Sequence, residues 1–222
     1  MRVIHAQVCI MIDFPNVHIM DHPLINDKIA RLRDVNTSTE RFRQLVQEIA
    51  TLETYESFKD VPTEKVSVTT PFETVEQTVV KKDSIAIVPI LRAGLGMVDG
   101  VFALLPTAKV GHIGLYRDET TLRPVTYYCK LPRGIEEMTV FVLDPMLATG
   151  GSSSDAIRKL KENGCRKIKF MAIIAAPEGV EALATAHPDV EIFVAALDRQ
   201  LNEDGYILPG LGDAGDRIFG TR

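Results

Sequence analysis

Cysteine is scarce in this sequence, and the few cysteines form no motif. Three occur among 222 residues, Cys9, Cys129 and Cys165, and they are far apart with no CxxC pair. This spacing argues against a disulfide framework and against a cysteine-based zinc site. We therefore expect reduced thiols in a cytosolic protein.

Long apolar runs and an excess of basic charge are also missing. No stretch approaches the ~20 apolar residues that a membrane helix needs. The early apolar run is interrupted by Asp13 and no small-residue cleavage site follows it, so we expect neither a signal peptide nor a membrane partner, and we expect a cytoplasmic location. The net charge is −5, which argues against a nucleic-acid partner because duplex-binding surfaces are usually basic.

What the sequence does contain is the pattern of one α/β domain. Strand and helix alternate from Ser84 to Leu197, and the apolar strand runs are nearly continuous, as in parallel strands buried on both faces. We predict a doubly wound, mostly parallel sheet, with ligands at the carboxyl ends of its strands. Before it come two strands at 64–70 and 72–80, which predict a small β-arm, and a helix over 34–58 with a capping box formed by Thr37 and Glu40.

The segment after the strand 139–144 has the composition of an anion-binding loop. Asp144 ends that strand, and the loop 146–154 carries two adjacent glycines and the hydroxyls of Thr149, Ser152 and Ser153 before a helix predicted over 153–163. Glycines let the backbone approach a ligand closely, and a helix start offers unpaired N–H groups to an anion. An ordinary capped helix is the alternative, although it needs only one cap and this loop supplies many more donors.

The loop is not a P-loop, because no GxxxxGK[ST] occurs and the loop has no lysine. A compact cradle without lysine suits one terminal phosphate better than a triphosphate chain. The carboxylate of Asp144 would repel a second phosphate but can accept hydrogen bonds from vicinal hydroxyls. The residues therefore predict a sugar phosphate, with its phosphate on the loop and its ribose hydroxyls on Asp144.

Several motifs together resemble one enzyme family. The segment "VFVLDPMLATGGS" is similar to the phosphoribosyl-diphosphate (PRPP) motif of type I phosphoribosyltransferases, and its "DPMLATGGS" form resembles the uracil phosphoribosyltransferases. "VPILRAGLGMVDG", "YRDETTLRPV", "AAPEGV", "AHPDVE" and "LNEDGYILPGLGDAGDRIFGT" resemble that family in the same order. The resemblance implies a pentosyltransferase, of the glycosyltransferase class, that transfers the 5-phosphoribosyl group of PRPP to N1 of uracil, giving UMP and diphosphate.

The resemblance also implies the extent of the domain and the residues of its site. It runs from about residue 18, so residues 18–222 are expected to form one phosphoribosyltransferase domain, and residues 1–17 an extension without function. The implied PRPP-binding residues are Arg92, Arg117, Asp144, Pro145, Met146, Leu147, Ala148, Thr149, Gly150, Gly151, Ser152 and Asp213. The implied uracil-binding residues are Ile207, Gly212, Asp213 and Ala214.

The chemistry gives three of these residues a catalytic role. Charge builds on the diphosphate as its bond to the sugar breaks, and Arg92 is expected to stabilise that charge, although a surface salt bridge is the commoner role of a lone arginine. Asp144 holds the ribose, and Asp213 is the candidate to accept the N1 proton. The carboxyl-terminal hood loop (residues 205–215) matches GxGxxG at 210–215, but no strand leads into that match, so it does not predict a dinucleotide site.

One position departs from the wider superfamily. Many type I enzymes have two adjacent acids after this strand, whereas the second position here is Pro145. We expect Mg²⁺ to arrive with PRPP rather than on a protein metal site. His18 and His22 have a spacing that can hold zinc on a helix, but no third ligand is evident.

Two rival functions and two properties stay open at this point. A phosphoribosyltransferase fold can serve as an RNA-binding regulator with weak catalysis, or can act on another base. By resemblance we expect a homodimer or homotetramer. GTP activates some relatives and is a possible activator here, but no residue of the sequence places a GTP site.

Overall fold

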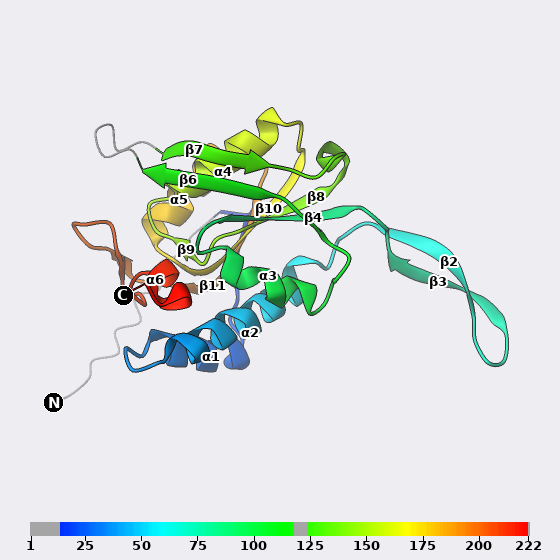
Figure 1. The fold of residues 1–222 in the computed structure, drawn as a ribbon, viewed down its shortest axis with the longest axis horizontal. Helices are drawn as coiled ribbons and strands as arrows, with labels where there is room; N and C mark the ends of the chain where they lie inside the picture. The colour runs from blue at the N-terminus through cyan, green and yellow to red at the C-terminus, as the bar shows by residue number, and fades with distance from the viewer. Residues whose placement is uncertain (1–13, 118–123, 222) are drawn as a thin grey trace.

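The computed structural model describes residues 14–117 and 124–221, and within them nine strands form one sheet with the order β1-β11-β10-β8-β4-β6-β7 (Figure 1). Strand β5 pairs with β4, and β9 pairs with β10. The paired strands are parallel except β6 and β7, which are antiparallel. The prediction of an α/β fold with a mostly parallel sheet is confirmed. The strands of this sheet are β1 (Val17–Ile19), β4 (Ile85–Leu91), β5 (Lys109–Val110), β6 (His112–Arg117), β7 (Pro124–Lys130), β8 (Thr139–Leu143), β9 (Met146–Leu147), β10 (Lys167–Ala175) and β11 (Glu191–Leu197).

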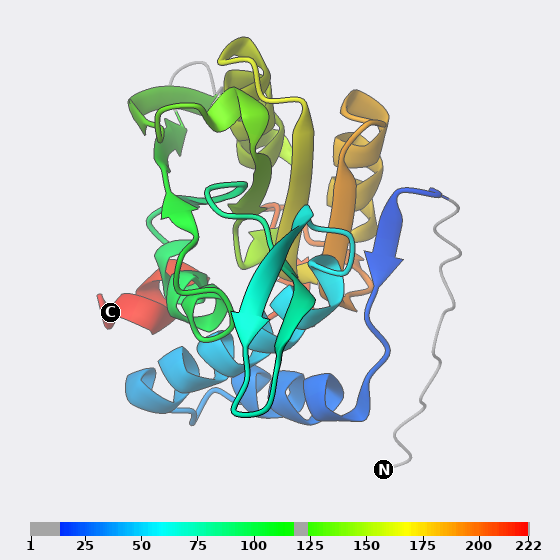
Figure 2. The ribbon, with the colours of Figure 1, turned by 90° about the vertical axis from the view of Figure 1, so that its right-hand side faces the viewer.

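The sheet is covered on both faces, which is why its strands are apolar along their whole length. Alternate residues of one strand point to opposite faces. In β4, Ile85 and Ile87 join a core with α1, α2, α3 and α6, whereas Ala86 and Val88 join a second core with α4 and α5. Figures 1 and 2 show these two groups of helices on opposite sides of the sheet. The helices are α1 (Pro23–Arg33), α2 (Thr39–Ser57), α3 (Leu95–Phe102), α4 (Gly151–Glu162), α5 (Pro177–Ala186) and α6 (Ala214–Phe219), with one 3₁₀ turn at Ile135–Glu137.

Helix α1 was not predicted, and it explains the two histidines. His18 lies in β1, whereas His22 is the cap of α1, where its Nδ1 accepts from the backbone N–H of Leu24 at 3.1 Å. The two side chains are therefore not on one helix, and the zinc spacing has no structural basis. The helix buries Ile25, Ile29 and Leu32, which lie on one face.

The start of α2 differs from the predicted capping box by one residue. Ser38, not Thr37, is the cap, and its Oγ accepts from the backbone N–H of Arg41 at 3.2 Å. The hydroxyl of Thr37 instead donates to the carbonyl of Arg31 at 2.6 Å, which ties the α1–α2 loop to α1.

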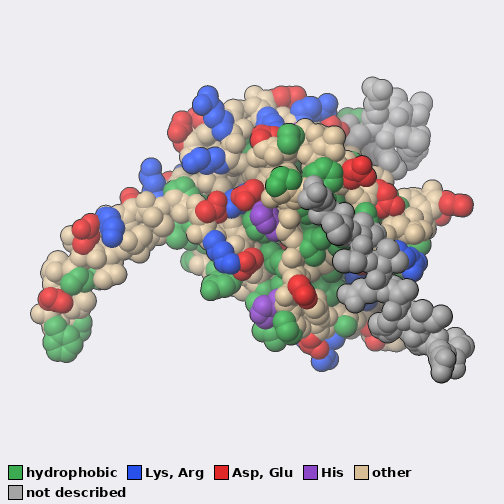
Figure 3. Space-filling model, turned by 180° about the vertical axis from the view of Figure 1, so that it is seen from behind, with side chains coloured by type: hydrophobic (Ala, Val, Ile, Leu, Met, Phe, Trp, Pro, Cys, Tyr) green, Lys and Arg blue, Asp and Glu red, His purple; other side chains and the backbone are tan. Residues whose placement is uncertain are grey.

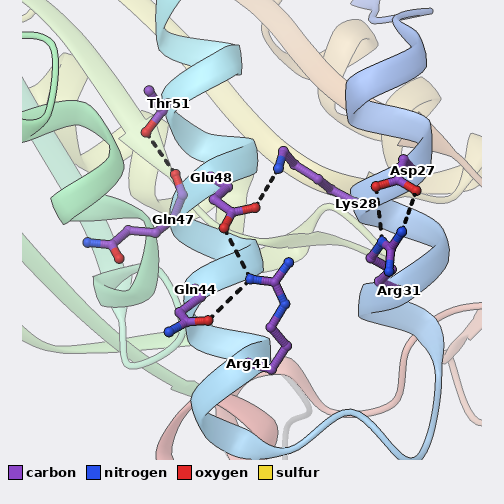
Figure 4. A network of polar contacts seen from close by, with 8 residues as sticks. All are labelled: Asp27, Lys28, Arg31, Arg41, Gln44, Gln47, Glu48 and Thr51. Carbon is purple, nitrogen blue, oxygen red and sulfur yellow. Dashed lines mark hydrogen bonds and ion pairs between the residues drawn. The ribbon is translucent and has the colours of Figure 1, made fainter.

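Helices α1 and α2 are joined by charged side chains on their outer surface (Figure 4). Lys28 of α1 pairs with Glu48 of α2, and Arg41 lies 3.2 Å from the other carboxylate oxygen of Glu48. Arg31 pairs with Asp27 within α1. Exposed pairs of this kind contribute little each, so the buried apolar faces hold the helices together and the pairs fix their register.

Strands β2 (Thr63–Thr69) and β3 (Thr74–Val80) form the predicted β-arm, which extends from the body of the molecule (Figure 1). The side chains of its two strands are exposed apart from the half-buried Val66 and Val75, and Phe72 at its tip is 96% exposed. A two-stranded hairpin is marginally stable on its own in water. The arm is thus a candidate contact surface.

Strand β1 lies at one edge of the sheet and begins at Val17, so the expected boundary between residues 17 and 18 falls within this strand. Asn16 also contacts the body of the protein, because its Nδ2 donates to the carbonyl of Val190 at 2.8 Å. Most of the predicted extension, residues 1–13, lies outside the described residues. The division into 1–17 and 18–222 stays a prediction.

Candidate active site

The loop after β8 is held by the neighbouring strand β10. Asp144 follows the last residue of β8, and its backbone N–H donates to the carbonyl of Met171 at 3.2 Å. The carbonyls of Pro145 and Leu147 accept from the N–H groups of Ile174 and Ala176 at 3.0 and 2.9 Å. The first half of the loop is therefore part of the sheet edge, and only its second half is free to surround a ligand.

The second half leads into a helix start without a side-chain cap. Gly150, the residue before α4, has a left-handed φ of +79°, which glycine adopts without strain, and no side chain caps the helix there. The helix begins at Gly151, two residues before its predicted start at Ser153. The N–H groups of its first turn and the positive end of its dipole are therefore available to an anion.

The hydroxyls of the loop divide into two groups. Thr149 and Ser152 are exposed, whereas Ser153 is only 2% exposed and faces the core. The expectation that Ser153 supplies a hydroxyl to the ligand is therefore wrong, because the earlier helix start turns it inward. Thr149 and Ser152 remain as candidate donors.

Helix α5 packs directly against the backbone of the loop after β8. A Cβ added at Gly179 would lie 2.2 Å from the carbonyl oxygen of Ala148 and 2.8 Å from that of Leu147. The position therefore accommodates only glycine if the loop is to stay in place. This contact was not predicted from the sequence.

We expect Gly179→Ala to weaken PRPP binding at least tenfold, because the methyl group displaces the loop backbone. Isothermal titration with PRPP measures this change. Thr185→Ala, at an exposed position on the same helix, is the matched control and should bind PRPP as the original protein does. Equal affinities for Gly179→Ala and the control would show that this packing does not shape the loop.

The first turn of α4 is also tied to the end of α5 through His187. The ring Nε2 lies 2.9 Å from the Ser154 hydroxyl, and Nδ1 lies 3.1 Å from the Lys161 ammonium, which itself donates to Asp189 at 2.6 Å. Burial, followed by the charge of Lys161, lowers the pKa of His187. Neutral His187 therefore accepts from Lys161 and donates toward Ser154.

Asp144 has an unusual charge state for a carboxyl group. Burial raises its pKa from 3.8 to about 7, although the N–H of Met146, 3.3 Å from Oδ1, opposes the shift. Among the described residues, this single N–H does not offset the cost of burying the charge. Hydroxyl donors or a cation at this position would favour the ionised form.

Arg92 and Asp144 follow the carboxyl ends of two neighbouring strands, because β4 and β8 are adjacent and parallel, with Pro89 opposite Leu143. The turn after β4 packs against the end of β8, and a Cβ at Gly94 would lie 2.3 Å from the carbonyl oxygen of Leu143. Arg92 itself is exposed, with its guanidinium 5.9 Å from the ring centre of Phe219. Within residues 14–117 and 124–221 no carboxylate pairs with it, which disfavours the surface salt bridge as its role.

Arg117 is the last residue of β6, which pairs with β4 at Ile90 and Leu91. The strand therefore continues past the end of β4 on the side of Arg92. The side chain of Arg117 lies outside the described part of the molecule.

The hood loop lies against both the loop after β8 and the turn after β4. A Cβ at Gly205 would lie 3.7 Å from the Thr149 side chain, and one at Gly215 would lie 3.9 Å from Cβ of Ala93. Its predicted uracil contacts Ile207 and Ala214 are 4% and 3% exposed, and their side chains pack into the core.

The other two predicted contacts in the hood loop, Gly212 and Asp213, are exposed. One oxygen of Asp213, Oδ1, already caps α6 by accepting from the N–H of Asp216 at 2.9 Å.

The structure thus brings Arg92, the loop 144–152 and the hood loop together at the end of the sheet where β4 and β8 have their carboxyl ends. Sequence reasoning missed the residues that hold the hood loop in place, Arg33, Asp198 and Arg217. Arg33 and Asp198 are 165 positions apart, so no local pattern could join them.

The described residues at this end of the sheet offer few ligands for a metal ion. Asp144 is followed by Pro145, and the described residues include no group of three His, Cys, Asp or Glu side chains that could hold a metal ion. This donor set fits a metal that binds together with an anionic ligand, not one held by the protein alone. None of the helices in the described ranges is both long and apolar enough to span a membrane.

Comparison with known proteins gives a consistent result. Residues 19–221 match the model of the uracil phosphoribosyltransferase family. The chain is 57% identical to the uracil phosphoribosyltransferase of Geobacillus sp. (strain WCH70) and 56% to that of Bacillus pumilus, in each case over 93% of this chain and 99% of the relative.

Among solved structures, a protein from Aquifex aeolicus aligns with a TM-score of 0.87 and 40% identity, covering 91% of this chain and 97% of that one. The adenine phosphoribosyl transferase of Trypanosoma brucei shares the fold alone, with a TM-score of 0.58, 12% identity, and coverage of 90% and 89%.

Proposed function

The chain belongs to the uracil phosphoribosyltransferase family, and from this premise we infer that it transfers the 5-phosphoribosyl group of PRPP to N1 of uracil, giving UMP and diphosphate. The observation that carries the inference is the identity of more than half of all aligned positions over 99% of the length of relatives with that name. The uncapped start of α4 beside the hood loop supports it, because its free N–H groups could hold a phosphate next to the loop that is expected to bind the base.

The phosphoribosyl group occupies the loop after β8. The 5′-phosphate accepts hydrogen bonds from the N–H groups at the start of α4 and from the hydroxyls of Thr149 and Ser152. The ribose hydroxyls donate to Asp144, which becomes ionised as they bind. Hydrogen bonds to a charged group contribute roughly 1.5–3 kcal/mol each, so the phosphate is held mainly by converging donors.

The diphosphate leaves toward Arg92 and Arg117. Negative charge grows on its oxygens as the bond to the anomeric carbon breaks, and guanidinium groups placed there lower the barrier. The planar fork of arginine binds two phosphate oxygens at once, which lysine cannot do. The absence of a carboxylate partner in the described residues leaves Arg92 available for this role.

Uracil binds against the main chain of the hood loop at Ile207, Gly212, Asp213 and Ala214. The N3–H of uracil lies between two carbonyl acceptors, a pattern that backbone groups can match. Cytosine reverses one donor–acceptor pair and would leave buried groups unpaired, which discriminates strongly. In this proposal Asp213 is the candidate to accept the N1 proton, and its Oδ1 also caps α6.

Mg²⁺ enters with PRPP. When bound, it neutralises diphosphate charge and so assists its departure. In this chain Asp144 is the acidic residue of the loop that can interact with the ribose and the metal together, because Pro145 removes the second acid.

A steady-state assay with PRPP and Mg²⁺ tests this function against uracil, cytosine, hypoxanthine and orotate. UMP formed from uracil, with the other bases at least a hundredfold poorer in kcat/KM, is the expected result. A preference for hypoxanthine or orotate would overturn the base assignment and leave the phosphoribosyl site standing.

The RNA-binding regulator is not favoured as an alternative. On the described face that Figure 3 shows, acidic and basic side chains are interspersed and the basic ones do not gather into one patch. Activation by GTP stays a prediction from the family resemblance, and adding GTP to the same assay tests it. A cytoplasmic location and a single domain over 18–222 are also part of the proposal.

We propose a homodimer or homotetramer in which the β-arm contacts a second copy. Replacing residues 66–77 with Asn-Gly closes the hairpin early and keeps the pairs Thr63–Val80 to Lys65–Thr78. We expect sedimentation velocity to show a smaller assembly for this variant, with a cooperative unfolding transition. An unchanged sedimentation coefficient, corrected for mass, would assign the oligomer contact to another surface.

A further inference from the structure

We propose that Arg33 and Asp198 are positioning residues for uracil recognition, because together they fix the backbone of the hood loop at Gly210. This inference rests on the proposed function, in which the same loop binds the base. Arg33 is the last residue of α1, and Asp198 directly follows β11. Neither residue belongs to the set that the family resemblance implies.

The three residues form a closed set of hydrogen bonds. Nη1 of Arg33 donates to Oδ2 of Asp198 and to the carbonyl of Gly210, both at 2.8 Å, and Nη2 donates to Oδ1 of Asp198. The N–H of Gly210 donates to Oδ2 of Asp198 at 2.9 Å. Both peptide groups of Gly210 are thus bound to a charged side chain, and such bonds are stronger than those between neutral groups.

These hydrogen bonds act at a tight turn of the hood loop. Gly210 has a φ of +65°, and a Cβ there would lie 2.1 Å from the carbonyl oxygen of Ile207. The predicted uracil contacts Gly212 and Asp213 follow within three residues. A shift of Gly210 is therefore passed to them along a short length of chain.

A second arginine holds the next carbonyl. Nη1 of Arg217 donates to the carbonyls of Leu211 and Leu32 at 2.8 and 2.9 Å, and its guanidinium stacks 4.3 Å from the ring centre of Phe42. Leu32 immediately precedes Arg33. The end of α1 is thus connected to two successive carbonyls of the hood loop, which presets the loop before uracil binds.

Burial makes the Arg33–Asp198 pair sensitive to substitution. The side chain of Asp198 is 3% exposed and that of Arg33 is 22% exposed. Lysine at position 33 keeps the charge but loses the planar fork, so it cannot serve both Asp198 and Gly210 with the same geometry. Asparagine at position 198 keeps an acceptor for Gly210 and loses the ionic contact.

Arg33→Lys and Asp198→Asn test the proposal, with Arg31→Lys as the matched control. Arg31 lies in the same helix turn but pairs with the exposed Asp27 instead of the hood loop. We expect both test variants to raise KM for uracil at least tenfold and KM for PRPP less than twofold, with no change in the control. A KM for uracil within twofold of the original, or equal rises for both substrates, would overturn the proposal.

Hydrogen exchange provides a readout that does not depend on activity. In Arg33→Lys the backbone amides of residues 207, 208 and 210–214 should exchange at least tenfold faster than in the original protein, while those of β4 and β8 keep their rates. Unchanged exchange in 207–214 would contradict the positioning role even if the protein made no UMP. Absence of UMP formation by the original protein would instead overturn the proposed function.

Discussion

Arg92→Ala is expected to lower kcat/KM for PRPP by about a thousandfold. Removing one group that stabilises developing charge costs 10²–10³ in rate in enzymes where it has been isolated. Arg92 binds two phosphate oxygens in the proposed complex, and the loss should appear in kcat as well as in KM. Steady-state kinetics with PRPP varied at saturating uracil measures it.

The same substitution should leave the free energy of unfolding within about 0.5 kcal/mol, because Arg92 is exposed and surface changes are usually small. Arg133→Ala removes another exposed arginine and is the control for lost charge. If Arg92→Ala retained more than a third of the original kcat/KM, Arg92 would not lie against the diphosphate in the transition state.

Asp144→Asn should lower kcat/KM at least a hundredfold and at the same time stabilise the protein above pH 7. Activity falls because the amide cannot supply a charged acceptor to the ribose hydroxyls, each such bond contributing roughly 1.5–3 kcal/mol. Stability rises because burial of the original carboxylate outweighs its one hydrogen bond, from the N–H of Met146. Opposite effects on activity and stability are common where a site is built for its ligand.

The pH dependence of that stability has a definite sign. The pKa of Asp144 is raised from 3.8 to about 7, so between these values the folded protein holds a proton that the unfolded chain has released. The original protein therefore loses stability as the pH rises from about 4 to 7, whereas residue 144 of the variant does not titrate. Each pKa unit is worth about 1.4 kcal/mol, so the variant's advantage reaches at most about 4 kcal/mol.

Urea unfolding of both proteins at pH 5 and pH 8 measures this difference. We expect the advantage of Asp144→Asn to be larger at pH 8 than at pH 5. Asp99→Asn makes the same substitution at an exposed position of α3 and should show no such pH dependence. An advantage that shrinks with rising pH would mean that Asp144 is stabilised as a carboxylate in the free protein.

The parts of the fold that follow local patterns could be predicted from the sequence. Strands β4, β8 and β10 are buried on both faces, and their continuous apolar runs show this directly. Asp144 was placed at the end of β8 because a carboxylate after such a run meets the edge where ligands bind. The antiparallel pairing of β6 and β7 was not predicted, since both read as ordinary strands.

Three predictions about helix starts were wrong or missing: the cap of α2, the presence of α1 and the start of α4. Thr37 and Ser38 can both cap a helix, and tertiary contact with Arg31 decides between them. Helix α1 was missed because Pro23 reads as a breaker, although proline is well tolerated in a first turn. Ser153 was expected to face the ligand because the left-handed Gly150 that starts α4 earlier is not visible in the sequence.

Contacts between distant parts of the chain could not be predicted at all. Gly179 is an ordinary helix residue by sequence, and only the fold brings it against Ala148. The hood loop is held by Arg33 and Arg217 through backbone carbonyls, which carry no sequence signal.

A crystal structure with UMP and diphosphate bound tests the central claim most directly. We predict the phosphate of UMP on residues 149–152, its ribose hydroxyls on Asp144, its base against residues 212–214, and diphosphate beside Arg92. A UMP phosphate bound anywhere else, for example between Lys109, His112 and Lys130, would contradict the assignment of the active site to this edge of the sheet.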